Sequence, residues 1–93
     1  MDYFQPEQYK VYMLNDEYTF PEFILIILGD HFGIYDEEAD NLLLEIQKNG
    51  RGLAGSYTYD IAMTKAKDVQ DVAFEFGFPL RCILEPDFSA ILI

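Results

Sequence analysis

Residues 9–19 read Tyr-Lys-Val-Tyr-Met-Leu-Asn-Asp-Glu-Tyr-Thr, and they contain the clearest structural signals of the chain. Residues 9–14 are rich in side chains that favour β-structure. The polar pair Asn15 and Asp16 comes directly after them and is typical of a turn. This stretch therefore predicts a strand over residues 9–14 that ends in a polar turn.

A helix is expected immediately after this turn. Thr19 and Glu22 have the spacing of a capping box, and a proline between them is favourable in a first helical turn. We expect the helix to cover residues 20–32 and to end at Gly33, which can adopt the left-handed conformation. Its interior, residues 23–28, is apolar on nearly every side, which is more than one core-facing stripe requires.

A second helix and a short strand follow. Asp36 is expected to cap this helix, which ends near Gly50, and a glycine-containing strand covers residues 52–57. The apolar residues of the helix have the i, i+3, i+4, i+7 spacing of one buried face. They are Ala39, Leu42, Leu43 and Ile46.

A third helix and a last strand complete the pattern. Thr58 is expected to cap this helix, and Gly77 to end it. The last strand is expected over residues 80–85, with Leu80, Cys82 and Leu84 on one side, and Pro86 is expected to stop it. The helix is expected to bury one face, made of Ile61, the stem of Lys65, Val69, Ala73 and Phe76.

The order β-α-α-β-α-β predicts an α+β sandwich in which a three-stranded antiparallel sheet packs against three helices. Residues 9–86 form the expected core. Residues 1–8 are expected to be a short flexible arm, and residues 87–93 a C-terminal tail.

Composition excludes several classes of protein. The chain has 93 residues, enough for one domain, and 51% of them are hydrophobic. Its formal net charge of −11 argues against binding to nucleic acid or to an anionic membrane. One cysteine cannot form an internal disulfide, and the longest apolar run is too short to span a bilayer. We expect a cytoplasmic protein.

Catalytic and metal-binding patterns are weak. Residues 50–55 spell G-x-G-x-x-G, but they follow a helix and open a strand, the reverse of a dinucleotide site. A calcium loop beginning at Asp36 would need glycine and glutamate where Asn41 and Gln47 stand. His31 and Cys82 have no partners that would complete a nucleophilic site. We therefore expect no enzyme activity, no cofactor and no metal.

The polar residues between the first strand and the first helix have two interpretations: Asn15, Asp16 and Glu17 either make the turn or bind a ligand. Residues 9–19 followed by Glu22-Phe23 resemble the opening of the ClpS family, the adaptors of the Clp protease. The resemblance covers roughly residues 9–86. Its further motifs are Asp36-Glu37-Glu38-Ala39, Gly50-Arg51-Gly52, Tyr57-Thr58, Thr64-Lys65 and Pro79-Leu80-Arg81-Cys82-Ile83-Leu84-Glu85.

The resemblance implies an adaptor that binds proteins with N-terminal Leu, Phe, Tyr or Trp and delivers them to a ClpA- or ClpC-type AAA+ unfoldase. It assigns the free amine of the substrate to Asn15, Asp16, Glu17 and Gln47. It assigns the unfoldase-docking surface to Thr64 and Lys65. The hydrophobic pocket it implies is made of Leu14, Thr19, Pro21, Ile24, Leu43, Ile46 and Leu80.

This sequence departs from the family pattern at the site. Gln47 replaces a histidine that accepts a hydrogen bond from the amine, although the Gln47 amide also has an acceptor oxygen. Pro21 replaces a Met- or Ile-type residue at the pocket, and Glu17 replaces an aspartate. The alternative hypothesis is a diverged ClpS-like protein that acts as an interaction module and does not recognise an N-terminal amine.

Overall fold

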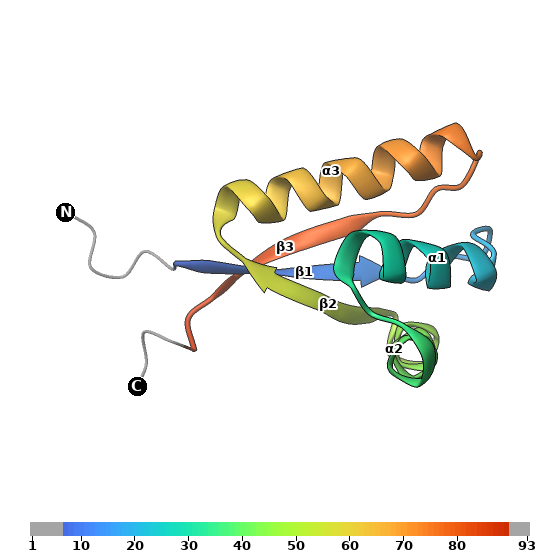
Figure 1. Ribbon diagram of the computed structural model, residues 1–93, viewed down its shortest axis with the longest axis horizontal. Coiled ribbons are helices and arrows are strands. Elements are labelled where there is room, and N and C mark those ends of the chain that lie inside the picture. The colour runs from blue at the N-terminus through green and yellow to red at the C-terminus, as the bar shows by residue number, and fades with distance from the viewer. Residues whose placement is uncertain (1–6, 90–93) are drawn as a thin grey trace.

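The computed structural model describes residues 7–89, and its elements follow the order expected from the sequence. The chain forms strand β1, helices α1 and α2, strand β2, helix α3 and strand β3 (Figure 1). The α+β class and the three-stranded antiparallel sheet are confirmed. The bounds are β1 Gln8–Leu14, α1 Pro21–Phe32, α2 Asp36–Asn49, β2 Arg51–Tyr57, α3 Tyr59–Glu75 and β3 Cys82–Asp87.

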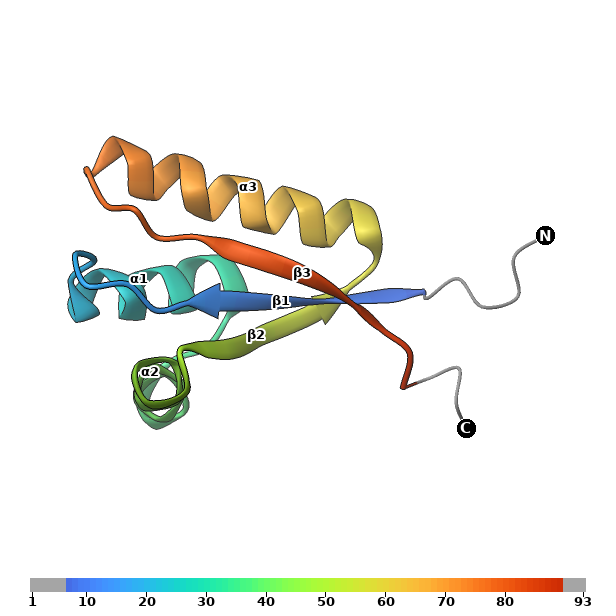
Figure 2. The same ribbon diagram turned by 180° about the vertical axis from the view of Figure 1, so that it is seen from behind.

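The sheet has the order β2-β1-β3, so β1 is central and pairs antiparallel with both neighbours. Val11 and Met13 of β1 are fully buried, whereas Tyr12 between them is only partly buried. The alternation shows that one sheet face meets the core. Helix α1 lies in front of the strands in Figure 1 and behind them in Figure 2, so it covers only the core-facing side of the sheet.

The opposite face of the sheet carries a polar cluster. The guanidinium of Arg51 on β2 lies 4.0 Å from the ring centroid of Tyr12 on β1. Its Nη1 also donates to Oε1 of Glu85 on β3 at 2.6 Å. Both charged side chains are more than 40% exposed, so solvent screens this link across the three strands and it adds little to stability.

Two of the expected helix caps are wrong. The N-cap of α1 is Phe20 instead of Thr19, and the N-cap of α2 is Tyr35 instead of Asp36. Asp36 is the first residue of its helix and has a positive φ of 54°, a conformation that short polar side chains tolerate best. Thr58 is the N-cap of α3 as expected, but its side chain makes no cap hydrogen bond.

The buried face of α3 also differs from the prediction. Val69 and Ala73 are buried, but Ile61 is 50% exposed and Phe76 is 66% exposed. The other buried positions are Ala62 and Ala66, whose small side chains let the helix approach the sheet closely. Lys65 is half-buried.

The ends of the strands correct three further expectations. β1 begins at Gln8, which the prediction placed in the arm. β3 begins at Cys82, after the buried Leu80, and continues through Pro86 to Asp87. Pro86 does not stop it, because β3 is an edge strand, where a residue without an N–H group is tolerated. Residues 1–6 and 90–93 of the expected arm and tail lie outside the described residues.

The glycines of the G-x-G-x-x-G stretch have structural roles. Gly50 ends α2 with a φ of 85°, a backbone conformation that residues other than glycine rarely adopt. A Cβ atom at Gly52 would lie 2.7 Å from Cγ1 of Ile46, so the strand could not approach α2 with a larger residue there. This confirms the turn interpretation of the motif. Within residues 7–89, no helix is both long and apolar enough to cross a membrane.

Candidate functional site

The loop between β1 and α1 is held at both sides by backbone hydrogen bonds. The N–H of Leu14 donates to the carbonyl of Arg81 at 3.0 Å, and the N–H of Asn15 donates to the carbonyl of Gly50 at 2.9 Å. Gly50 caps the C-terminus of α2, whose last turn contains Gln47. These bonds bring Asn15 and the end of α2 to one corner of the molecule, as the proposed amine site requires.

Asp16 organises this loop. Its Oδ1 accepts hydrogen bonds from the N–H groups of Tyr18 at 2.8 Å and Thr19 at 2.7 Å. Its Oδ2 accepts from the Thr19 hydroxyl, also at 2.7 Å. The Thr19 side chain is thus directed back to Asp16, which explains why it does not cap α1. Asp16 therefore has the turn-forming role that was one of the two interpretations of this segment.

The hydrogen bonds also keep Asp16 charged. Partial burial by itself raises the pKa of this carboxyl, but the bonds from Thr19 and Tyr18 stabilise the charged form. Together they lower the pKa below its ordinary value of 3.8. A negative charge is thus fixed at this corner at neutral pH.

Asn15 differs from Asp16 because its side chain is free. It is exposed, and its amide forms no hydrogen bond with the rest of residues 7–89. Glu17 and Gln47 are exposed as well. The loop therefore presents an unpaired amide beside carboxylates, a set of acceptors suited to a cationic group.

The residues expected to form the hydrophobic pocket divide into two groups. Thr19, Ile24, Ile46 and Leu80 are at most 7% exposed and belong to the interior. Leu14 and Leu43 are half-buried, and Pro21 is exposed. Thus three of the expected wall residues reach the surface, and four are buried.

A group of exposed aromatic rings lies next to this corner, and sequence reasoning missed it. Phe20 packs on Phe78 with 5.1 Å between ring centroids, and Phe76 packs on Phe23 at 5.4 Å. Phe74 is 83% exposed, the largest value among the exposed apolar side chains. A hollow of about 470 Å³ is lined by Tyr18, Phe74, Gly77, Phe78 and Pro79.

The signal for these rings was present in the sequence. Phenylalanines at positions 74, 76 and 78 alternate with other residues, a period that does not fit one face of a helix. Since α3 ends at Glu75, the last two of them lie beyond the helix. We name the exposed rings of Tyr18, Phe20, Phe74 and Phe76 the aromatic end.

The expected docking residues lie on α3, away from the loop. Nζ of Lys65 donates to the carbonyl of His31 at 2.7 Å and lies 5.2 Å from the ring centroid of Tyr57. Lys65 thus connects α3 to the end of α1, a structural role that the sequence did not reveal. Thr64 is exposed, and both residues line a hollow of about 280 Å³ with Asp60, Ile61 and Asp68.

Cys82 is a core residue. It is 7% exposed, and burial raises the pKa of its thiol to about 12, so the reactive thiolate is not formed at neutral pH. Among residues 7–89, no group of three or more His, Cys, Asp or Glu side chains is placed to hold a metal ion.

Comparison with known proteins defines the class first. A family model described as "ATP-dependent Clp protease adaptor protein ClpS" matches residues 4–83, so the chain is a protease adaptor by class. ClpS of Paracidovorax citrulli is 42% identical over 81 residues, 87% of this chain and 66% of that protein. ClpS of Acetivibrio thermocellus is 39% identical over 87 residues, 94% of this chain and 88% of that protein. The chain belongs to the ClpS family.

A solved structure has the same fold. Agrobacterium tumefaciens ClpS2 bound to L-phenylalaninamide superposes with a TM-score of 0.84 at 35% sequence identity. The match covers 89% of this chain and 100% of that chain. The family suggested by the sequence motifs is therefore confirmed.

The Asp16 hydrogen bonds predict an acid-dependent loss of stability. Because the pKa is lower in the folded state, the carboxylate stabilises the fold above about pH 4 and ceases to do so as the pH falls through the folded value. Asp16→Ala should lower the free energy of unfolding by about 1–3 kcal/mol at pH 7, and the difference from the parent protein should shrink below pH 4. Urea unfolding followed by circular dichroism measures both.

Asp40→Ala is the control, since it removes an exposed carboxylate from α2. It should change the free energy of unfolding by less than about 0.5 kcal/mol at pH 7. An equal effect of the two substitutions would show that the hydrogen bonds of Asp16 do not stabilise the fold.

Proposed function

We propose that this chain recognises proteins by a bulky hydrophobic N-terminal residue and delivers them to a Clp AAA+ unfoldase for degradation, without catalysing a reaction itself. The observation that carries the proposal is the structural neighbour, which is bound to L-phenylalaninamide. That ligand combines a free α-amine with an aromatic side chain. The corner around Asn15 offers groups for both parts.

The amine is assigned to the polar side of the corner. A protonated amine loses its hydration on binding, and this is costly unless oxygen acceptors replace the water. The unpaired amide oxygen of Asn15 and that of Gln47 serve as acceptors, and Glu17 adds negative charge. Asp16 contributes mainly by holding the loop, because both of its oxygens already accept hydrogen bonds.

The side chain of the N-terminal residue is assigned to the apolar side. The resemblance assigns it to Leu14, Leu43 and Pro21, which reach the surface, and to Ile46 and Leu80, which are buried. Burying one large apolar side chain contributes about 1.5–3 kcal/mol, and each charge-assisted hydrogen bond contributes about the same. Because the cost of association is subtracted from this sum, binding should be weak enough for cargo release.

A binding measurement tests this assignment. A peptide that begins with Leu or Phe should bind, and N-acetylation should abolish binding because it removes the charge. Asn15→Ala should weaken binding about tenfold to a hundredfold, the equivalent of one charge-assisted bond. Fluorescence anisotropy measures the affinities, and Asn41→Ala, an exposed asparagine on the middle of α2, is the matched control.

One outcome of this measurement would contradict the proposal. If acetylated and free peptides bind equally, the amine is not recognised and the proposal is wrong. The chain would then be an interaction module of ClpS fold, the second candidate function. The aromatic end supports that candidate, since Tyr18, Phe20, Phe74 and Phe76 are all more than 60% exposed.

The presence of Gln47 in place of a histidine predicts how the peptide affinity depends on pH. Because an amide does not titrate, the affinity for a Leu-initiated peptide should stay nearly constant between about pH 5.5 and 7. Gln47→His should introduce a pH dependence, with binding weakening as the imidazole gains a proton below about pH 6.5 and repels the amine. The same pH profile for both proteins would place Gln47 outside the amine site.

Delivery is assigned to the surface of α3 that contains Thr64 and Lys65. The hollow that they line also contains the apolar side chain of Ile61 and the carboxylates of Asp60 and Asp68. These are the groups that it offers to an unfoldase. Lys65 is a poor test residue because its bond to His31 also stabilises the fold.

Thr64→Arg is therefore the better test. It places a bulky side chain in the exposed hollow and should abolish delivery while leaving peptide affinity unchanged. Degradation of a Leu-initiated reporter by a reconstituted ClpA or ClpC protease measures delivery, and anisotropy measures affinity. Unimpaired degradation by the variant would exclude this surface.

A further inference from the structure

A hollow between α2 and β2 has no part in the proposed function. Its volume is about 510 Å³, and it lies on the side of α2 that faces β2. The apolar part is formed by Ile34 before α2, Leu42 on α2, and Leu53 and Ala54 on β2. Asn15 and the other predicted site residues do not line it.

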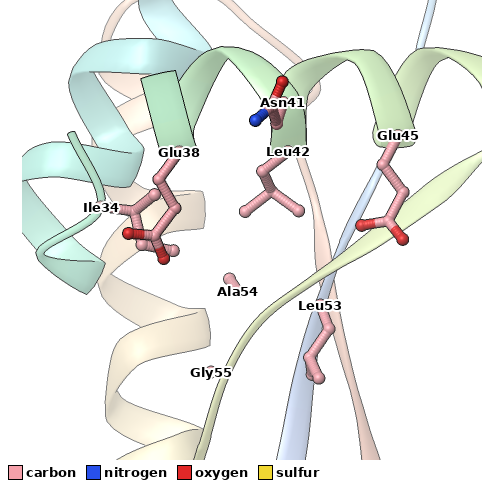
Figure 3. A pocket seen from close by; sticks show the side chains of 8 residues that line it. All are labelled: Ile34, Glu38, Asn41, Leu42, Glu45, Leu53, Ala54 and Gly55. Carbon is pink, nitrogen blue, oxygen red and sulfur yellow. The ribbon is translucent and has the colours of Figure 1, made fainter. Parts of the chain in front are cut away.

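Two carboxylates border this apolar surface. Glu38 and Glu45 extend from α2 on either side of Leu42, toward the strand (Figure 3). Both are exposed, and neither forms an ion pair within the part of the chain that the structure describes. No lysine or arginine lines the hollow. Asn41 and Gly55 complete its lining, so it is a mixed apolar and polar hollow with two uncompensated negative charges.

The strand beneath the carboxylates has a free edge. β2 is one of the two edge strands of the sheet and pairs only with β1 among residues 7–89. The register shifts between Val11 and Tyr12, so Ala54 has no partner on β1. An edge strand leaves N–H and C=O groups unpaired, and an extended chain can form hydrogen bonds with them.

We propose that this hollow binds an extended segment of a partner protein in which two basic residues flank an apolar one, in the pattern basic-x-apolar-x-basic. Alternate residues of an extended chain point to the same side, so all three side chains face α2. The apolar side chain contacts Leu42 and Leu53. The two basic side chains pair with Glu38 and Glu45.

The spacing supports this pattern. Seven residues along a helix separate Glu38 from Glu45 by about 10.5 Å. The basic residues, four positions apart in an extended chain, are separated by about 13 Å. The flexible side chains of Lys and Arg are long enough to absorb this difference.

Charge selects the partner. The chain has a net charge of −11, and the carboxylates would repel a second copy of it at this edge. A basic segment is attracted instead, and the attraction between exposed charges is screened beyond about 8 Å at physiological salt. Binding should therefore weaken as the salt concentration rises.

The test uses the probe acetyl-Gly-Lys-Ser-Leu-Ser-Lys-Gly-amide. Acetylation removes the free N-terminal amine, so the result does not depend on the proposed function. NMR titration of the full chain should shift the backbone amides of residues 53–55 and of the middle of α2. The double variant Glu38→Gln/Glu45→Gln should weaken binding about fivefold, the effect of two exposed ion pairs.

A second double variant controls for overall charge. Glu37→Gln/Asp40→Asn also removes two negative charges from α2, but neither residue lines the hollow. It should change the affinity less than about twofold. A probe with Glu in place of both Lys residues should not bind.

Several results would overturn the proposal. Equal weakening by the two double variants would show nonspecific attraction to an acidic protein. Shifts confined to other surfaces, equal binding of the Glu probe, or no shifts at millimolar concentration would each show that the hollow does not bind such a segment.

Discussion

The hydrogen bond from the Asn15 N–H to the Gly50 carbonyl connects the end of the central strand to the end of α2. Together with the bond from Leu14 to Arg81, it sets where the loop before α1 begins. The Asp16 carboxylate then fixes the loop through three hydrogen bonds. Without these contacts, the Asn15 amide and the side chain of Gln47 would not share one corner of the molecule.

The loop thus divides its polar residues between structure and binding. Both carboxylate oxygens of Asp16 accept hydrogen bonds from Thr19 or Tyr18, whereas the neighbouring Asn15 side chain is left free and exposed. Because the Asn15 backbone is held by its bond to Gly50, only side-chain freedom is lost when the amide accepts a hydrogen bond from a ligand. The proposed amine recognition relies on this arrangement, in which Asp16 organises the loop and the Asn15 side chain before it is free to bind.

Local patterns were reliable where a single physical effect dominates. The existence of β1, the left-handed Gly33, the end of α2 at Gly50 and the burial of Cys82 were all predicted correctly. The expected caps at Thr19 and Asp36 failed because capping competes with other interactions. The Thr19 hydroxyl bonds Asp16 instead.

The buried face of α3 failed for another reason. Periodicity favoured the large side chains of Ile61 and Phe76, yet both are exposed. The helix buries Ala62 and Ala66 beside the expected Val69 and Ala73, and the small alanine side chains let it lie close to the sheet. Lys65 was expected to bury its stem and to serve in docking, but its hydrogen bond to the end of α1 was not foreseen. Such contacts join residues far apart in the chain, so spacing along the sequence does not reveal them.

The sequence by itself determined the order of elements, the antiparallel α+β class and membership of the ClpS family, because these follow from local propensities and from motifs in order. The tertiary structure decided which side chains are free. Asn15 and Asp16 are adjacent and similar in size and shape, but their hydrogen bonds depend on how the loop closes. It also decided that Glu38 and Glu45 border a free strand edge, because only folding brings α2 beside β2.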